Sequence, residues 1–119
     1  MATTPLLQAL QGYLQVTADR QQLVTTNMAN VDTPGYHTQD VNFQTAMQQV
    51  MDQSGNMKLQ PASVEVDNLP ERPDGNNVSV ERESLLLAEA QMKFNLGIQL
   101  LKDQFHLISS AINSGGTTS

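Results

Sequence analysis

The stretch that decides the fold is Asn27–Phe43, NMANVDTPGYHTQDVNF, because a helical pattern runs into it and a different pattern leaves it. A proline disfavours helical geometry in the residue before it, so Pro34 predicts that the preceding helix ends near Asn30. The sequence Thr-Pro-Gly-Tyr at residues 33–36 fits a type II turn, with proline at the second position and glycine at positive φ in the third. The stretch therefore predicts a helix end followed by a tight turn.

A heptad seam predicts a long helix before this turn. Thr4 followed by Pro5 is a good helix start, because threonine caps free N–H groups and proline loses nothing at the first helical position. Thr17 and Gln21 dilute the seam, so the helix gains little stability by itself. The seam positions recur at alternating steps of three and four, as in a coiled coil: Leu7, Leu10, Leu14, Thr17, Gln21, Val24 and Met28.

After the turn, apolar residues at helical spacing cover only a shorter and more irregular stretch. A second, short helix is predicted from the spacing of Phe43, Met47, Val50 and Met51, with Asp40 or Asn42 as its cap.

The next segment, residues 52–77, contains three prolines and two glycines, which exclude a long helix. Val64 and Val66 alternate with polar neighbours, and so do Val78 and Val80. Short strands and a mobile insertion are both left open for this segment.

A longer helix is predicted at the C-terminal end. Ser79 can cap it, and Glu81 and Glu83 suit the positive end of the helix dipole. Glu89 and Lys93 have the spacing of a weak local ion pair, and the tail NSGGTTS, residues 113–119, ends the helix. Two apolar seams follow the cap, one through Leu87, Ala90, Phe94, Gly97 and Leu101, the other through Ile98, Leu101, Phe105, Ile108 and Ile112.

These patterns predict a mainly α fold in which long N- and C-terminal helices pair as a coiled coil around a short irregular or β-containing insertion. The expected parts of this single structural unit are residues 1–51, the insertion 52–78, and residues 79–119 with the tail. Because one partner helix cannot cover two apolar faces, we expect the C-terminal helix to contact other chains. The residues expected to make these coiled-coil contacts are Leu7, Leu10, Leu14, Val24, Met28, Leu87, Phe94, Ile98, Leu101, Phe105, Ile108 and Ile112.

The composition excludes several classes of function. The chain has 119 residues, which suits one domain, and no cysteine, which excludes disulfides, thiolate metal sites and cysteine catalysis. Its formal net charge is −6 and its six basic residues are scattered, so we expect neither nucleic-acid binding nor attraction to anionic membranes. No apolar run approaches the ~20 residues that span a bilayer. The first residues lack the features of a cleaved signal peptide.

No arrangement of polar residues predicts an enzyme, a metal site or a cofactor. His37 and His106 lie on different elements without a carboxylate at metal-binding spacing, so we expect both to face solvent or to pack. Asp32 and Asp40 flank the turn, but a calcium loop needs more oxygen ligands at closer spacing. We therefore expect turn or cap roles for both aspartates. The serines lack a nucleophile elbow or triad, and no glycine pattern could cradle phosphate.

A helix end and a turn account for Pro34 and Gly35, but not for the other residues of the opening stretch. Residues 27–36, NMANVDTPGY, resemble the signature of the bacterial flagellar axial proteins, the family of rod, hook and hook-associated proteins. That family carries Asn-x-Ala-Asn-x-x-Thr-Pro-Gly-Tyr just after its first helix. The matching positions, with two that follow them, are Asn27, Ala29, Asn30, Thr33, Pro34, Gly35, Tyr36, Asp40 and Phe43.

Within that family the chain is most similar to the small proximal rod proteins. The resemblance rests on DRQQLVTTN at residues 19–27, DVNF at residues 40–43 and GNNVSVERE at residues 75–83, and it covers residues 6–51 and 74–113. The chain departs from the family pattern at His37, where lysine or arginine is common. It also departs at Met28, Ser84, Ala90 and Phe94. None of these departures breaks the turn or a helix.

The resemblance implies a structural role. In such proteins the terminal helices pair and stack with those of neighbours into a hollow tube, and the segment after the Pro-Gly turn reaches towards adjacent subunits. The implied partners are other rod subunits, further copies of the chain, and the junction with the basal-body ring and export gate. The implied location is the periplasmic rod, reached through the flagellar type III apparatus.

The diluted seam suits this route, because marginal helices can remain unfolded during export and fold on docking. Three alternatives remain: another rod protein of the same family, a soluble coiled-coil module such as an export chaperone, and an enzyme. A chaperone of this kind would be folded by itself as a dimer.

Overall fold

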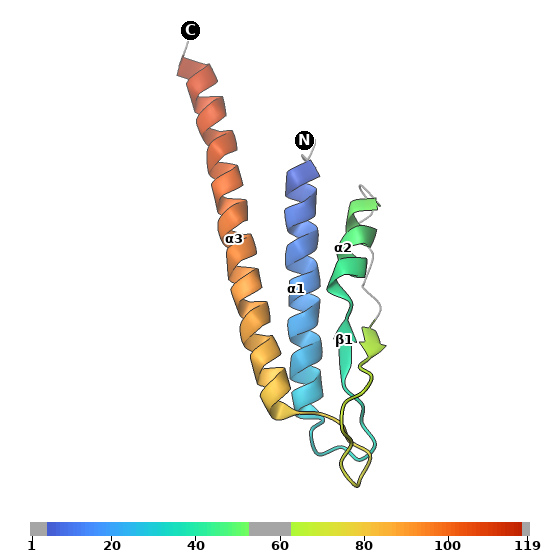
Figure 1. The fold of residues 1–119 in the computed structure, drawn as a ribbon. Coiled ribbons are helices and arrows are strands. Elements are labelled where there is room, and N and C mark those ends of the chain that lie inside the picture. Colours follow the sequence, from blue (N-terminus) through green and yellow to red (C-terminus); the bar gives the residue numbers. More distant parts are fainter. Residues whose placement is uncertain (1–4, 53–62, 118–119) are drawn as a thin grey trace.

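The computed structural model describes residues 5–52 and 63–117 and shows an elongated, mainly helical molecule of 74 × 25 × 18 Å (Figure 1). In chain order a short strand-containing insertion lies between two long helices, which confirms the predicted fold class. The predicted cap Thr4 lies outside the described residues. The elements in chain order are α1 (Pro5–Ala29), β1 (Gln39–Val41), α2 (Phe43–Asp52), β2 (Ser63–Glu65) and α3 (Val80–Thr117).

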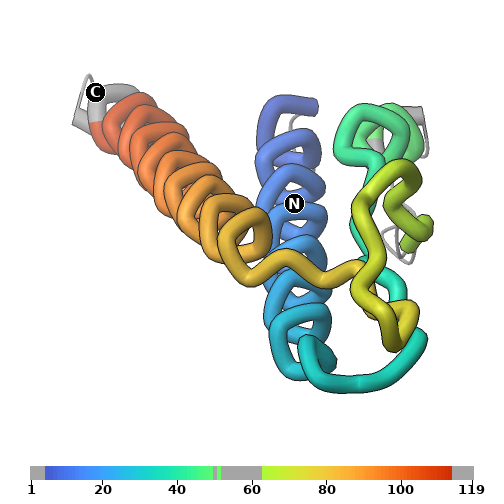
Figure 2. Tube along the Cα trace, turned by 60° about the horizontal axis from the view of Figure 1, so that its bottom comes forward, coloured from blue at the N-terminus to red at the C-terminus, as the bar shows by residue number. Residues whose placement is uncertain are grey.

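The helices α1 and α3 run antiparallel from a common base, and α1 lies between α3 on one side and β1 with α2 on the other (Figures 1 and 2). Ala90 is buried at the interface. At Gly97 the two helices approach so closely that an added Cβ would lie 2.7 Å from Cδ2 of Leu14 and 3.0 Å from Cδ1 of Tyr13. The absence of a side chain at Gly97 therefore permits this helix contact.

The predicted seam of α1 turns inward. Leu7, Leu10, Thr17 and Val24 are buried, and the remaining seam positions are partly buried. The polar member Thr17 is satisfied within its own helix, because its hydroxyl donates to the carbonyl of Tyr13 at 2.6 Å. Thr17 is therefore buried without leaving an unpaired polar group.

A second buried face of α1 was not predicted. Val16 packs with Val41 and Ala46 in a small core. The ring of Phe43, at the start of α2, meets Tyr13 edge to face with centroids 5.6 Å apart. This face holds β1 and α2 against α1, so α1 is the central helix of the molecule.

The helix end and the turn are as predicted. Helix α1 ends at Ala29, and the N–H of Tyr36 donates to the carbonyl of Thr33 at 3.2 Å. Gly35 has φ of 75°, the left-handed region that glycine adopts without a steric penalty. Nothing lies within 4 Å of the position where a Cβ would stand at Gly35, so the conformation, and not space, requires glycine.

The short helix α2 is confirmed, and the structure decides its cap. Oδ1 of Asn42 accepts from the N–H of Thr45 at 3.1 Å, so Asn42 is the cap. Asp40 is neither a turn nor a cap residue, because it lies in β1 and pairs with side chains of both long helices. The side chain of Val50 lies outside the described residues.

Strand β1 pairs with β2 in an antiparallel ribbon, in which Gln39 lies opposite Glu65 and Val41 opposite Ser63. The strand possibility at Val64 is confirmed. The one at Val78 and Val80 is wrong, since Val80 already begins α3. Ser79 stops any extended run there, because its hydroxyl accepts from the N–H of Arg82 at 3.2 Å and so caps the helix.

Helix α3 is longer than predicted and continues to Thr117, so the expected end at Asn113 was wrong. Adding residues to a formed helix costs much less than starting one, so α3 extends through residues 113–117 although two of them are glycines. Asn27 contacts Glu83, and Leu14 lies beside Gly97. This register carries the end of α3 past the described start of α1 (Figure 1). No helix in the described ranges has the length and apolar character that a bilayer crossing needs.

The helix register can be tested by cross-linking, because the chain contains no cysteine of its own. The pair Leu14→Cys with Gly97→Cys should form an intramolecular disulfide on mild oxidation, since the two positions are in contact. Leu14→Cys removes the Cδ2 atom that the new Cβ would meet at 2.7 Å, and a small shift of the Tyr13 ring, 3.0 Å away, makes the remaining room. The control pair, Leu14→Cys with Leu96→Cys, should not close, because Leu96 is exposed on another face of α3. Intact mass and non-reducing gels report the bond. Equal yields from both pairs would contradict the register.

Candidate functional site

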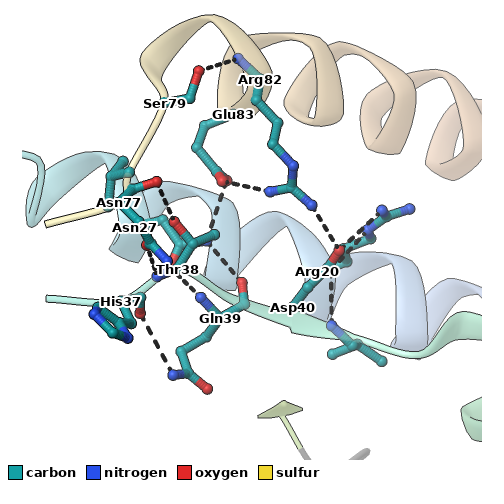
Figure 3. Close-up of polar contacts among 12 residues, drawn as sticks. Arg20, Asn27, His37, Thr38, Gln39, Asp40, Asn77, Ser79, Arg82 and Glu83 are labelled. Carbon is teal, nitrogen blue, oxygen red and sulfur yellow. Dashed lines mark hydrogen bonds and ion pairs between the residues drawn. The ribbon is translucent and has the colours of Figure 1, made fainter. Parts of the chain in front are cut away.

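The side chain of Asn27 is the centre of a polar junction at the base of the helix pair (Figure 3). It is 1% exposed. Its Nδ2 donates to the carbonyl of Gln39 at 2.8 Å and to Oε2 of Glu83 at 3.1 Å. Its Oδ1 accepts from the Tyr36 hydroxyl at 2.9 Å and from the N–H of Gln39 at 3.1 Å. Every donor and acceptor position of the amide is therefore used, and one side chain joins α1, the turn, β1 and α3.

Glu83 is the partner of this amide on α3, and it is fully buried at 0% exposure. The predicted place in the first turn of α3 is confirmed, but a match to the helix dipole does not explain the burial. A buried carboxylate is costly unless it is paired and hydrogen-bonded. Arg82 supplies the opposite charge at 2.9 Å, and Asn27 supplies the second hydrogen bond.

Asp40 connects the two long helices through two arginines. Arg20 of α1 holds it with a forked contact, Nε to Oδ1 at 3.1 Å and Nη2 to Oδ2 at 3.2 Å. Arg82 of α3 approaches the same carboxylate at 3.7 Å (Figure 3). The basic residues are scattered in the sequence, but the fold gathers these two on one aspartate.

The ion-pair chain continues along the helices. Arg20 lies 3.7 Å from Glu89, and the predicted local pair is confirmed, with Lys93 at 3.0 Å from Glu89. The hydrogen bond and charge of Lys93, with a smaller effect of Arg20, lower the pKa of Glu89. Lys93 also lies 4.9 Å above the ring centre of Phe43, a cation–π contact to α2.

Burial, and secondly the charge of Glu83, raise the pKa of Tyr36. The phenol therefore stays protonated and remains a donor to Asn27 at neutral pH.

Two asparagines just before α3 form hydrogen bonds to the turn and to the residues that follow it. Asn76 is fully buried, and its Nδ2 donates to the carbonyls of Asn30 at 2.9 Å and Thr33 at 2.8 Å. Oδ1 of Asn77 accepts from the N–H of Thr38 at 2.7 Å. These bonds close the loop between α1 and β1 against the residues that lead into α3.

A second glycine turn lies against the first. The N–H of Gly75 donates to the carbonyl of Arg72 at 2.8 Å, and Gly75 has φ of 85°. A Cβ at Gly75 would lie 3.4 Å from Cα of Gly35, and the N–H of Gly35 donates to the carbonyl of Asp74 at 2.8 Å. The two turns are therefore in direct backbone contact.

The structure brings most of the predicted motif together. Thr33 donates to Asn30 at 3.0 Å, and Asn30 donates to the carbonyl of Thr26 at 2.8 Å. Ala29 and Pro34 are exposed. The motif residues Asn27, Tyr36, Asp40 and Phe43 all contact the junction or its extension.

The two predicted seams of α3 differ in how far their residues are buried. In the first, Ala90 and Gly97 are buried and the other members are partly buried. In the second, Ile98 and Ile108 are partly buried, whereas Phe105 and Ile112 are exposed.

Helix α3 carries a further apolar face, which is exposed. We call it the outer stripe: the exposed fractions of its members are Leu85 70%, Met92 73%, Leu96 55%, Leu100 45% and Leu107 64%. Their spacing places them on one side of α3, opposite the residues that face α1.

Sequence reasoning missed Asn76, Asn77, Arg20 and the burial of Glu83. The one signal in the sequence was an Asn-Asn pair directly before the Val-Ser start of a helix, where loop asparagines commonly satisfy backbone groups.

Both histidines were expected to face solvent or to pack. His106 is exposed on α3. His37 is different, because Nδ1 contacts a carboxylate oxygen of Glu65 and Nε2 lies 3.2 Å from Oε1 of Glu71. In the described ranges no three histidine or acidic side chains could hold one metal ion.

Comparison with known proteins gives consistent names. The chain is 28% identical over 125 residues to the flagellar basal body rod protein FlgB of Salmonella typhimurium, covering 88% of the chain and 91% of that protein. It is 29% identical, with the same coverage, to FlgB of Yersinia ruckeri. It is 24% identical to FlgB of Bacillus subtilis, covering 92% of the chain and 94% of that protein. No family model matches the chain.

We predict that Asn27→Ala destabilises the folded chain strongly. It removes one hydrogen bond from the buried carboxylate of Glu83 and two from the partly buried backbone of Gln39, and a buried polar group left unpaired costs about 1–3 kcal/mol. Urea unfolding followed by circular dichroism measures the effect, with the Leu14→Cys, Gly97→Cys disulfide present in every variant to hold the helix pair. Asn95→Ala, at an exposed position of α3, is the matched control. An Asn27→Ala midpoint equal to that of the control would refute the central role of the amide.

Proposed function

The chain belongs to the family of flagellar basal body rod proteins, and from this premise we propose that it is a structural subunit that builds the rod by packing its helices against neighbouring axial subunits. Its partners are then other rod proteins, further copies of itself, and the junction with the basal-body ring and export gate. No catalysis is part of this role.

The observation that carries the proposal is the outer stripe of α3. A helix with apolar residues on two opposite faces needs partners on both. One face packs on α1, and the outer stripe has no cover among the described residues of this chain. Burying a large aliphatic side chain is worth about 1.5–3 kcal/mol. Coverage of the stripe by neighbouring helices would therefore stabilise an assembly substantially.

The small internal core supports folding on assembly. Among the described residues eight apolar side chains are buried, whereas eleven large ones are exposed. A single chain thus buries too little apolar surface to offset much conformational entropy. We propose that the chain passes the flagellar type III apparatus unfolded, without a cleaved signal peptide, and folds as it docks in the periplasmic rod. The segment after the Pro-Gly turn then reaches towards adjacent subunits.

Leu96→Glu should abolish or sharply reduce swimming. It places a charge in the middle of the outer stripe, where assembly would bury it unpaired. Asn95→Glu adds the same charge at the neighbouring exposed position and should swim nearly normally. Soft-agar swimming of cells that carry only the variant gene measures both, and immunoblots check that the levels of chain are equal. Normal swimming by Leu96→Glu would contradict assembly through this face.

Gly35→Val should also block assembly, because a β-branched residue resists the φ of 75° at this position. Gly35→Asn is the matched control, since asparagine tolerates positive φ and the position has free space. Basal bodies isolated from each strain should retain the Asn variant and lack the Val variant. Equal retention of the two would show that the turn conformation does not matter.

A further inference from the structure

His37 lies between two carboxylates that come from one later segment of the chain. Nδ1 contacts Glu65 on β2, and Nε2 lies 3.2 Å from Oε1 of Glu71, in the loop that follows β2. The side chains of all three residues are between one third and about one half exposed, at 34%, 53% and 54%. The proton on the ring can therefore exchange with solvent.

The geometry selects one protonation state. A neutral imidazole has one N–H donor and one bare nitrogen, whereas the imidazolium has a donor on both nitrogens. A bare nitrogen facing a carboxylate is repulsive. The two contacts are favourable together only when the ring is charged, so deprotonation must break one of them.

These contacts are the only ion pairs or hydrogen bonds made by side chains of this segment that the described part of the chain shows. The backbone of β2 adds a three-residue pairing with β1, and the N–H of Val66 donates to the carbonyl of Thr38 at 3.0 Å. All three β2 side chains are exposed, including Val64 at 50%, so apolar burial contributes little within the strand, and after it Val66 and Leu69 are only partly buried. A short two-stranded ribbon of this kind is marginal in water.

The neighbouring loop is fixed by other means. Arg72 donates to the carbonyls of Val78, at 2.9 Å, and Val31. Asn76 ties the same loop to the turn. None of these bonds uses His37. Loss of its contacts would release residues 63–71 and leave the junction and the helix pair in place.

We propose that His37 is a proton-operated clasp that holds residues 63–71 against the turn segment and releases them as the pH rises. The charged groups that face the ring are Glu65 from β2 and Glu71 from the following loop. The hydrogen bond and charge of Glu65, the charge of Glu71 and a backbone group of Gly75 raise the pKa of His37, and partial desolvation opposes them. The clasp lies within one folded chain, and its contacts do not involve the surfaces proposed to build the rod.

The direction of the pH dependence follows from the raised pKa of His37. The clasp contributes its full stabilisation below pH ~6.5, the ordinary value for histidine. It loses this contribution as the pH rises through the higher pKa of the folded chain. Acid conditions therefore close the clasp, and alkaline conditions open it.

The test is NMR on the full chain with the helix pair locked by the Leu14→Cys, Gly97→Cys disulfide. Trimethylamine N-oxide can be added to favour the folded chain, and helical circular dichroism is recorded at every pH. His106→Gln leaves one histidine, so the imidazole signal is assigned without ambiguity. Nuclear Overhauser contacts between β1 and β2 report whether the segment is held.

The expected result has two parts. His37 titrates above 6.5, and this shift is lost in the Glu65→Gln, Glu71→Gln double variant. The β1–β2 contacts are present at low pH and disappear above the midpoint of that titration, whereas helicity is unchanged.

Two substitutions of His37 test whether a positive charge at this position is what holds the β1–β2 contacts. His37→Lys, a permanent cation over this range, should keep the β1–β2 contacts at both ends of the titration. His37→Gln should lack them throughout. Contacts that persist in the unmodified His37 chain above its titration, or that are absent at every pH, would overturn the clasp. If the chain with the disulfide lock forms no helix, the clasp is overturned too, because the two contacts of His37 would not exist in it.

Discussion

The arrangement of this molecule depends on the buried amide of Asn27. That one side chain satisfies the hydroxyl of Tyr36, both backbone groups of Gln39 and the carboxylate of Glu83. These partners belong to the turn, to β1 and to α3, so the direction in which each segment leaves the end of α1 is fixed at one point. An apolar contact could supply similar stability, but only directional hydrogen bonds also select a single geometry.

The polar junction and the apolar faces therefore have separate roles. Around the junction, Asp40 joins the two long helices through Arg20 and Arg82, and Asn76 closes the loop from the opposite side. Away from it, the helices touch along a seam in which Leu14 and Tyr13 lie directly against α3 at Gly97. The outer stripe of α3 is left exposed. A subunit with a defined base and uncovered helix faces is suited to build a larger structure, which agrees with the names of its relatives.

Local signals made much of this fold predictable. The heptad spacing predicted the inward face of α1. Pro34 and Gly35 predicted the turn, and Ser79 predicted the start of α3. What could not be predicted depends on partners far along the chain. The burial of Glu83 requires Asn27, 56 positions away, and β1 exists only because β2 returns to pair with it. The contacts of His37 were missed for the same reason, since both glutamates lie in the later segment.

The proposed role makes this chain a structural part of the flagellar rod. The most direct measurement is mass spectrometry of basal bodies that have been washed with detergent and salt, prepared from cells that carry the native chain. We expect the chain to remain in the rod fraction after these washes, together with other rod proteins. A chain that is absent from that fraction, and is instead found in the cytoplasm as a folded dimer, would contradict it.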